Sequence, residues 1–248
     1  MPTDHLTYQL SYRFPIAVVR LTGELTGTST RPAHTALVET LMEEPTSVVV
    51  DLSGVTRADG AGLALFPAMG KLAREWPGAR LLLCGLTPGV TAALPESGWV
   101  SVYDTLADAL AAASTDPVPQ RVHRFLEPTV AAPRVAREMA THAWWDWNLP
   151  GGPSSAQILA SELVTNGVRH ARTPLSFSMT LRDGRIRLSV QDWAAIPVRL
   201  RSPTESDLQG RGLIVVGAIA ARWGSVPLGD GKVVWAELAV PPDPEREG

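Results

Sequence analysis

Strand signals and helix signals alternate along the first half of the chain. Alternating or continuous apolar runs predict strands at 6–14, 16–25, 47–55, 79–86 and 99–104. Apolar residues at helical spacing predict helices at 31–45, 62–76, 88–94 and 106–113. Strands separated by short helices indicate an α/β layer with a mixed, partly parallel sheet.

This alternation stops at 114–120, where two prolines and small polar residues replace any periodic pattern. Such a segment is typical of a linker. A chain of 248 residues is long enough for two small domains. We expect a first domain at 1–115, a linker at 116–121 and a second domain at 122–242. The acidic, proline-rich tail 243–248 is expected to be disordered.

The second half has a different order of elements. A strand-like segment at 122–129 is followed by two helical patterns, 135–148 and 154–171, with Ser154 or Ser155 as the expected N-cap of the second. A hairpin pattern, a helical pattern and a final strand are then expected at 175–193, 212–223 and 232–240. Helices first and mostly antiparallel strands later indicate an α+β sandwich.

Composition excludes several classes of protein. Hydrophobic residues make up 45% and charged residues 19%, which is ordinary for a globular protein. The net charge of −3 gives no bulk attraction to nucleic acid or to acidic membranes. No apolar run has transmembrane length and the start lacks a signal-peptide pattern, so we expect a cytoplasmic protein. Cys84 is the single cysteine, which excludes a disulfide framework within the chain. Because it stands in an apolar run, we expect its side chain to be a small buried hydrophobe and not a nucleophile.

The long expected helix of the second half carries Glu162 and Asn166 one turn apart. At about 100° per residue these two and Arg169 share one stripe, while Leu163 and Gly167 project from another side. One interpretation is simple contact with solvent. The other is a site in which the amide oxygen ligates a hard cation and the carboxylate orients or deprotonates a water or hydroxyl.

Two features further along the chain favour the second interpretation. Asp192 ends the second strand of the expected hairpin, where its carboxylate could accept the exocyclic amine of adenine, although a turn-capping role fits equally well. Gly210 and Gly212 stand directly before an apolar helix. Glycines at this place let backbone N–H groups approach a phosphate, although a tight turn is the alternative.

This order of elements resembles the histidine-kinase-like (GHKL/Bergerat) ATPase fold, and within it the small bacterial anti-sigma-factor serine kinases, over roughly 122–240. The resemblance implies ATP and Mg²⁺ as cofactors. It implies that Glu162 is the general base, Asn166 the magnesium ligand and Asp192 the adenine contact. The phosphate contacts that it implies are Gly210, Arg211 and Gly212.

The chain also departs from that family's pattern. The run that begins at Asp192 reads Asp-Trp-Ala-Ala-Ile, where the family often has Asp-x-Gly-x-Gly, and Trp193 is expected to narrow or stack in the pocket. Val233 stands where the family often has a threonine. No GxxxxGK[ST] motif is present, so phosphate binding would use backbone amides, arginine and magnesium.

The run VVVDLSGVTRADGAGLALF in the first half resembles the sulphate-transporter and anti-sigma-antagonist (STAS) domain, over roughly 5–113. Antagonists of that family carry a phosphorylated serine within a motif like Asp-Ser-Ser-Gly-Leu. This chain reads Asp-Gly-Ala-Gly-Leu at 59–63, and Ala61 offers no oxygen nucleophile. Ser53 and Thr56 are interpreted as turn hydroxyls.

Together the two resemblances imply a bacterial partner-switching regulator. Its second domain would act as a serine/threonine kinase on a separate STAS antagonist, with a sigma factor as a further partner and a homodimer also allowed. Its own STAS domain would be a docking module that is not phosphorylated. The alternative is a non-catalytic module that binds nucleotide or partners only.

Overall fold

The structure is a computed structural model, and it describes residues 5–171, 173–194, 211–228 and 231–240. The chain divides into two compact units, Met1–Val118 and Pro119–Gly248. Each unit has its own five-stranded sheet. None of the described helices is both long and apolar enough to span a membrane.

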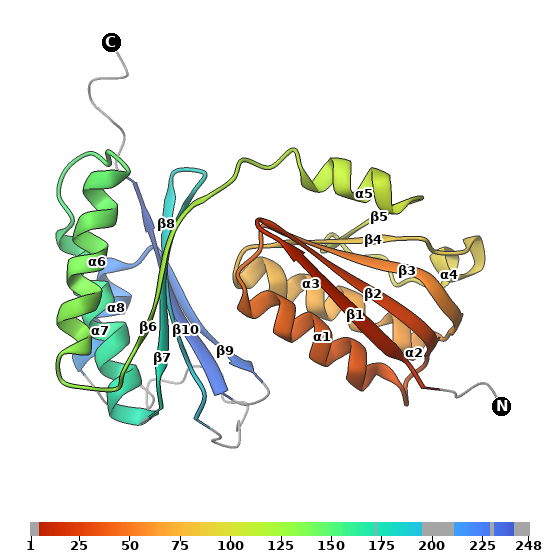
Figure 1. Ribbon diagram of the computed structural model, residues 1–248, viewed down its shortest axis with the longest axis horizontal. Coiled ribbons are helices and arrows are strands. Elements are labelled where there is room, and N and C mark those ends of the chain that lie inside the picture. The colour runs from red at the N-terminus through yellow and green to blue at the C-terminus, as the bar shows by residue number, and fades with distance from the viewer. Residues whose placement is uncertain (1–4, 172, 195–210, 229–230, 241–248) are drawn as a thin grey trace, which may run out of the picture. The chain divides into compact units, whose positions relative to one another are not determined.

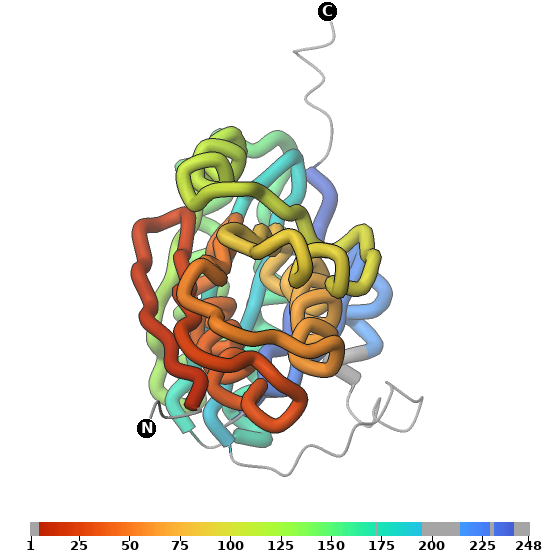
Figure 2. Tube along the Cα trace, turned by 90° about the vertical axis from the view of Figure 1, so that its right-hand side faces the viewer, coloured from red at the N-terminus to blue at the C-terminus, as the bar shows by residue number. Residues whose placement is uncertain are grey.

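The first unit has a mixed sheet with the strand order β1-β2-β3-β4-β5. These strands are β1 (Thr7–Arg13), β2 (Ile16–Leu25), β3 (Ser47–Ala58), β4 (Arg80–Cys84) and β5 (Val100–Tyr103). β1 and β2 form an antiparallel hairpin, and the pairs from β2 to β5 are parallel. Figure 2 follows this hairpin, drawn in red, along one edge of the sheet. The expected α/β layer with a partly parallel sheet is confirmed.

Helices cover both faces of this sheet, with α1 and α3 on one face and α5 on the other (Figure 1). The helices of the unit are α1 (Thr30–Met42), α2 (Gly60–Leu63), α3 (Leu65–Glu75), α4 (Pro88–Ala93) and α5 (Leu106–Ala113). Residues 47–52 of β3 are all buried. Burial on both faces explains why this strand reads as a continuous apolar run instead of an alternating one.

The second unit has an antiparallel sheet with the strand order β6-β7-β8-β10-β9. Its strands are β6 (Gln120–Leu126), β7 (Leu175–Arg182), β8 (Arg185–Asp192), β9 (Arg222–Leu228) and β10 (Gly231–Ala239). Its helices are α6 (Ala132–Asp146), α7 (Ser154–His170) and α8 (Arg211–Ile219). These three helices of the described residues lie on one face of the sheet (Figure 1).

The core of this unit lies between that sheet face and the helices. Alternate residues of β7, β8 and β10 point toward it, so the three strands contribute apolar rows to one buried cluster. These rows are Leu175, Phe177 and Met179; Ile186, Leu188 and Val190; and Val234, Ala236 and Leu238. The expected hairpin of β7 and β8 is confirmed, and its turn residues Asp183 and Gly184 have φ angles of 51° and 69°.

The structure corrects three local expectations. The helix expected at 212–223 ends at Ile219, and the following residues form β9, which the sequence did not predict. Pro227 argues against a strand in the sequence, but a proline is tolerated at this place because β9 is an edge strand. α7 begins at Ser154 with Pro153 in the cap position, so neither expected serine caps it. Finally, residues 120 and 121 lie within the expected linker, but they pair with β7 and form the first residues of β6.

Candidate functional site

Helix α7 approaches the sheet closely at Gly167. A Cβ atom at this position would lie 3.0 Å from both terminal methyl carbons of Leu175 and 3.3 Å from a methyl carbon of Val190. Leu175 is the residue that pairs with Asp192 across the hairpin. The contact therefore places the turn of α7 that carries Asn166 next to the end of the sheet that carries Asp192.

Glu162 and Asn166 lie on the flank of α7 that faces away from α6. The opposite flank is in contact with α6, since Ser161 Oγ accepts a 2.8 Å hydrogen bond from Arg137 and Gln157 donates a 2.7 Å hydrogen bond to Thr141. At 100° per residue, Glu162 and Asn166 project from the other side of the buried stripe.

Both side chains are half-buried, and neither is held by another side chain or backbone group of the described residues. Neither Glu162 nor Asn166 makes a hydrogen bond or an ion pair within the described part of the chain. An unengaged amide and an unengaged carboxylate one turn apart can hold a hard cation and accept a proton, respectively. These two residues therefore fit the chemistry that a magnesium nucleotide requires.

Asp192 is the last residue of β8 and is only 2% exposed. Its side chain is on the helix-covered face, where it continues the apolar row of β8. Its Oδ1 accepts the backbone N–H of Ala194 at 3.2 Å, and its Oδ2 lies 3.3 Å from Lys232 Nζ. The bond to Ala194 is the turn-capping role that the sequence allowed. The carboxylate keeps further lone pairs that could accept a hydrogen bond from a base.

The expected phosphate contacts are described only in part. Arg211 is the first residue of α8 and Gly212 the second, so the helix begins where the glycine-containing segment predicts it. Gly210 lies outside the described residues. α8 contacts α7. The beginning of α8 is a helix N-terminus of the kind that favours phosphate charge.

Trp193 does not occupy the position that the sequence suggested. Its ring packs against Phe125 of β6, with 6.0 Å between the ring centroids. Phe125 alternates with the core residue Leu126, so its side chain projects from the sheet face opposite the helices. The backbone N–H of Trp193 is held by Thr173 Oγ1 at 3.3 Å. The tryptophan therefore turns away from the side of the sheet that carries Asp192.

The motif at 59–63 in the first unit forms α2 and its cap. The carboxylate of Asp59 accepts the backbone N–H of Gly62 at 2.7 Å and that of Gly27 at 3.1 Å. This carboxylate joins the loop after β2 to the first turn of α2. Ala61 lies in that turn and is exposed. The structure thus presents position 61 to solvent with a methyl group in place of a hydroxyl.

A pocket of ≈ 550 Å³ lies beside this motif, at the ends of β2 and β3. Its lining includes Asp59, Thr28 and the ion pair between Arg57 and Glu24, whose charged atoms are 3.4 Å apart. The sequence did not single out Arg57, Glu24 or Thr28. The pocket adds charged and hydroxyl groups to the surface around Ala61.

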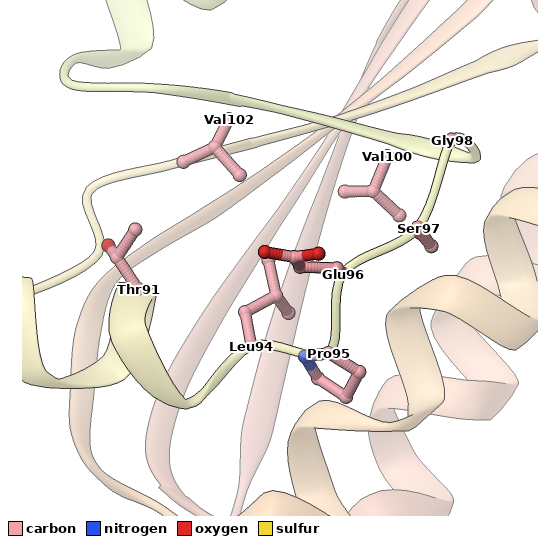
Figure 3. A pocket seen from close by; sticks show the side chains of 8 residues that line it. All are labelled: Thr91, Leu94, Pro95, Glu96, Ser97, Gly98, Val100 and Val102. Carbon is pink, nitrogen blue, oxygen red and sulfur yellow. The ribbon is translucent and has the colours of Figure 1, made fainter.

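A second pocket, of ≈ 560 Å³, lies between α4 and the edge strand β5. Figure 3 shows Val100 and Val102 of β5 on one side and Thr91 and Leu94 on another. Glu96 supplies the one charged side chain of the lining. This pocket is separate in sequence from the motif at 59–63.

Cys84 is fully buried, as expected. Burial, together with the nearby charge of Asp51, raises the pKa of the Cys84 thiol to about 11. The side chain is therefore a protonated hydrophobe at neutral pH and not a nucleophile. The prediction for this residue is confirmed.

Sequence reasoning missed Lys232, although the chain contains only two lysines. The residue lies on β10 directly opposite Asp192, in the antiparallel pairing of β10 with β8. The rarity of lysine in this chain was an available signal. The pairing partner was not, because it depends on the register between two strands that are far apart in sequence.

Residues 13–115 match a family model described as "Mlab, STAS domain". No curated protein matches the chain. One similar solved structure is an anti-sigma factor antagonist from Mycobacterium paratuberculosis, with 24% identity over 45% of this chain and 97% of that one and a TM-score of 0.36. Another is the Bacillus cell fate determinant SpoIIAA in its phosphorylated form, with 20% identity over 43% and 98% of the two chains and a TM-score of 0.34.

A third similar structure contains the RsbU and RsbW domains of Rv1364c from Mycobacterium tuberculosis. It is 18% identical over 49% of this chain and 32% of that one, with a TM-score of 0.38. The family match covers β2 to β5 and the helices of the first unit, including the motif at 59–63. The first unit of this chain is therefore a STAS domain, over residues 13–115.

Proposed function

We propose that the chain is a partner-switching regulator whose second unit binds Mg-ATP and phosphorylates a serine or threonine of a separate STAS antagonist. The observation that carries the proposal is the placement of Glu162 and Asn166. Both lie half-buried on the flank of α7 that faces away from α6, without a hydrogen bond or ion pair to any described residue, beside the end of β8 that carries Asp192. The STAS domain of the first unit supports a role among proteins that exchange sigma-factor partners.

Each residue of the second unit has a distinct role in this proposal. The Asn166 amide oxygen would hold the magnesium ion, and Asp192 would accept the amino group of the base. Glu162 would accept the proton of the acceptor hydroxyl. ATP supplies the phosphoryl group, so that the bond from its γ-phosphorus to the bridging oxygen breaks as the bond to the acceptor oxygen forms, and ADP leaves. The backbone at the beginning of α8 would hold phosphate charge.

The STAS domain would serve as a docking module. Ala61 is exposed in the first turn of α2, where a partner can reach it, but it has no oxygen to accept phosphate. The domain would therefore stay unmodified at this position while its surface remains available. A sigma factor and a separate antagonist are the partners that this arrangement suggests.

One observation favours a second candidate function. Asp192 is held by Lys232 and by the backbone of Ala194, which gives its carboxylate a complete structural role without any nucleotide. A second unit that uses Asp192 only in this way would be a non-catalytic binding module. Binding and transfer must therefore be measured separately.

The test uses the full chain with labelled ATP, magnesium and two kinds of acceptor. The acceptors are STAS antagonists with the Asp-Ser-Ser-Gly-Leu motif and the chain's own Ala61→Ser variant. We expect transfer to both, and we expect Glu162→Gln to abolish transfer while Mg-ATP still binds. Glu138→Gln is the matched control, because Glu138 is an exposed glutamate on α6 that forms an ion pair with Arg134. Unchanged transfer by Glu162→Gln would refute the assigned role.

A further inference from the structure

We propose that Lys232 sets the choice of purine in the second unit, so that the site accepts guanine nucleotides as well as adenine nucleotides. The inference rests on the proposed function, since it concerns the base end of the same nucleotide site. It adds a specificity-determining residue and a second substrate class to that site.

The position of Lys232 is set by the pairing of β10 with β8. Lys232 is the direct partner of Asp192, so the two side chains leave the sheet on the same face. The preceding residue, Gly231, lies where the backbones of β10 and β8 approach each other closely. A Cβ atom on it would collide with the carbonyl oxygen of Asp192 and would lie 2.8 Å from the carbonyl carbon. Lys232 Nζ is 3.3 Å from Asp192 Oδ2.

The pair stands at the end of two buried apolar rows. Ile186, Leu188 and Val190 precede Asp192 in one row, and Val234, Ala236 and Leu238 follow Lys232 in the next. Both rows face the helices. The Asp192 side chain is 3% exposed, whereas that of Lys232 is 30% exposed. Part of the Lys232 side chain is therefore reachable from solvent at the point where the apolar rows end, which suits a flat base with a polar edge.

Hydrogen-bond chemistry then decides which base fits. A carboxylate alone accepts a hydrogen bond from the amino group of adenine. It repels the 6-oxo group of guanine, because the carboxylate and the 6-oxo group are both acceptors. An ammonium group beside the carboxylate supplies the missing donor. Guanine presents an acceptor oxygen next to N–H donors, which is the complement of an ammonium–carboxylate pair. Asp192 keeps the lone pairs that adenine needs, so the pair accepts either base.

The experiment is a titration of the full chain with Mg-ATP and, separately, with Mg-GTP, followed by calorimetry. We expect both nucleotides to bind. Lys232→Met should weaken Mg-GTP binding by about tenfold to a hundredfold, which is the effect of losing a hydrogen bond from a charged group. Binding of Mg-ATP should fall much less or improve.

Two further variants make the result specific. Lys232→Arg keeps the positive charge and the donors and should keep Mg-GTP binding, which separates base recognition from a general loss of folding. Lys71→Met removes the other lysine of the chain, which is exposed on α3 of the first unit, and should change neither affinity. An equal effect of Lys232→Met on both nucleotides, or no effect on either, would overturn the inference.

The failure of this inference can be told from the failure of the proposed function. If the chain binds Mg-ATP and the ratio of the two affinities does not depend on Lys232, only the inference falls, and Lys232 merely neutralises a buried carboxylate. If the chain binds neither nucleotide, the proposed nucleotide site falls and this inference falls with it.

Discussion

Two glycines of the four-residue helix α2 offer a matched test of how the STAS motif is built. A Cβ atom at Gly62 would collide with the carbonyl oxygen of Leu25 and would lie 2.7 Å from its carbonyl carbon and 3.0 Å from the backbone nitrogen of Thr26. These are backbone atoms at the end of β2, which cannot move alone. A Cβ atom at Gly60 would meet nothing within 4 Å. We therefore expect Gly62→Ala to be destabilising and Gly60→Ala to be harmless.

The size of the difference follows from these contacts. Both substitutions restrict the unfolded chain, which stabilises each variant by about 0.4–1 kcal/mol. This contribution cancels in the comparison of the two. Overpacking costs Gly62→Ala a further ~1–3 kcal/mol, because the collision is with backbone. At about 4 °C per kcal/mol for a unit of this size, the two variants should differ by about 4–12 °C in melting temperature.

The assay is thermal and urea denaturation of the full chain, with hydrogen exchange used to assign each transition to one unit. The transition of the first unit should occur earlier in Gly62→Ala than in Gly60→Ala, while the second unit should be unchanged. Equal stability of the two variants would refute the reasoning, because it would mean that α2 does not pack against the end of β2 as the structure describes.

Three other outcomes are expected. Burial raises the pKa of Glu237, but hydrogen bonds and charge from Arg187 and Arg185 outweigh it and hold that pKa below the usual 4.5. The stability that this carboxylate contributes is therefore complete above its unfolded pKa and is lost as the pH falls through the lower folded pKa. Urea denaturation across acidic pH should show a difference between wild type and Glu237→Gln that shrinks as the pH falls; a constant difference would contradict this. Incubation of the wild-type chain with Mg-ATP should leave residues 51–65 without phosphate in mass spectrometry, and stoichiometric phosphate there would contradict the docking role. The Cys84 thiol should react with an alkylating agent only when the first unit unfolds; fast reaction of the native chain would contradict its burial.

Local sequence patterns predicted the helices and strands whose side chains are buried at regular intervals along the chain. The run at 47–52 is largely apolar because this part of β3 is buried on both faces, and the hairpin of β7 and β8 alternates because its faces differ. The helix with Glu162 and Asn166 was predicted from the same kind of periodicity. Its buried side, with Leu163 and Gly167, is the side that the sequence indicated.

Features that depend on tertiary contacts could not be predicted from these local patterns. β9 carries Pro227 and a glycine, and it is a strand only because β10 pairs with it. Which flank of α7 faces away from α6 is decided by the position of α6, not by α7 itself. The contact of Lys232 with Asp192 requires the register between β8 and β10. The orientation of Trp193 likewise depends on Phe125, which belongs to the edge strand β6.

The most direct test of the central claim is a titration of the full chain with ATP, with and without magnesium, for the wild type and for Asn166→Ala. Ser155→Ala, an exposed position at the beginning of the same helix, is the control. We predict saturable, magnesium-dependent binding to a single site in the wild type and in the control, and its loss in Asn166→Ala. Absence of binding by the wild type, or full magnesium-dependent binding by Asn166→Ala, would contradict the account.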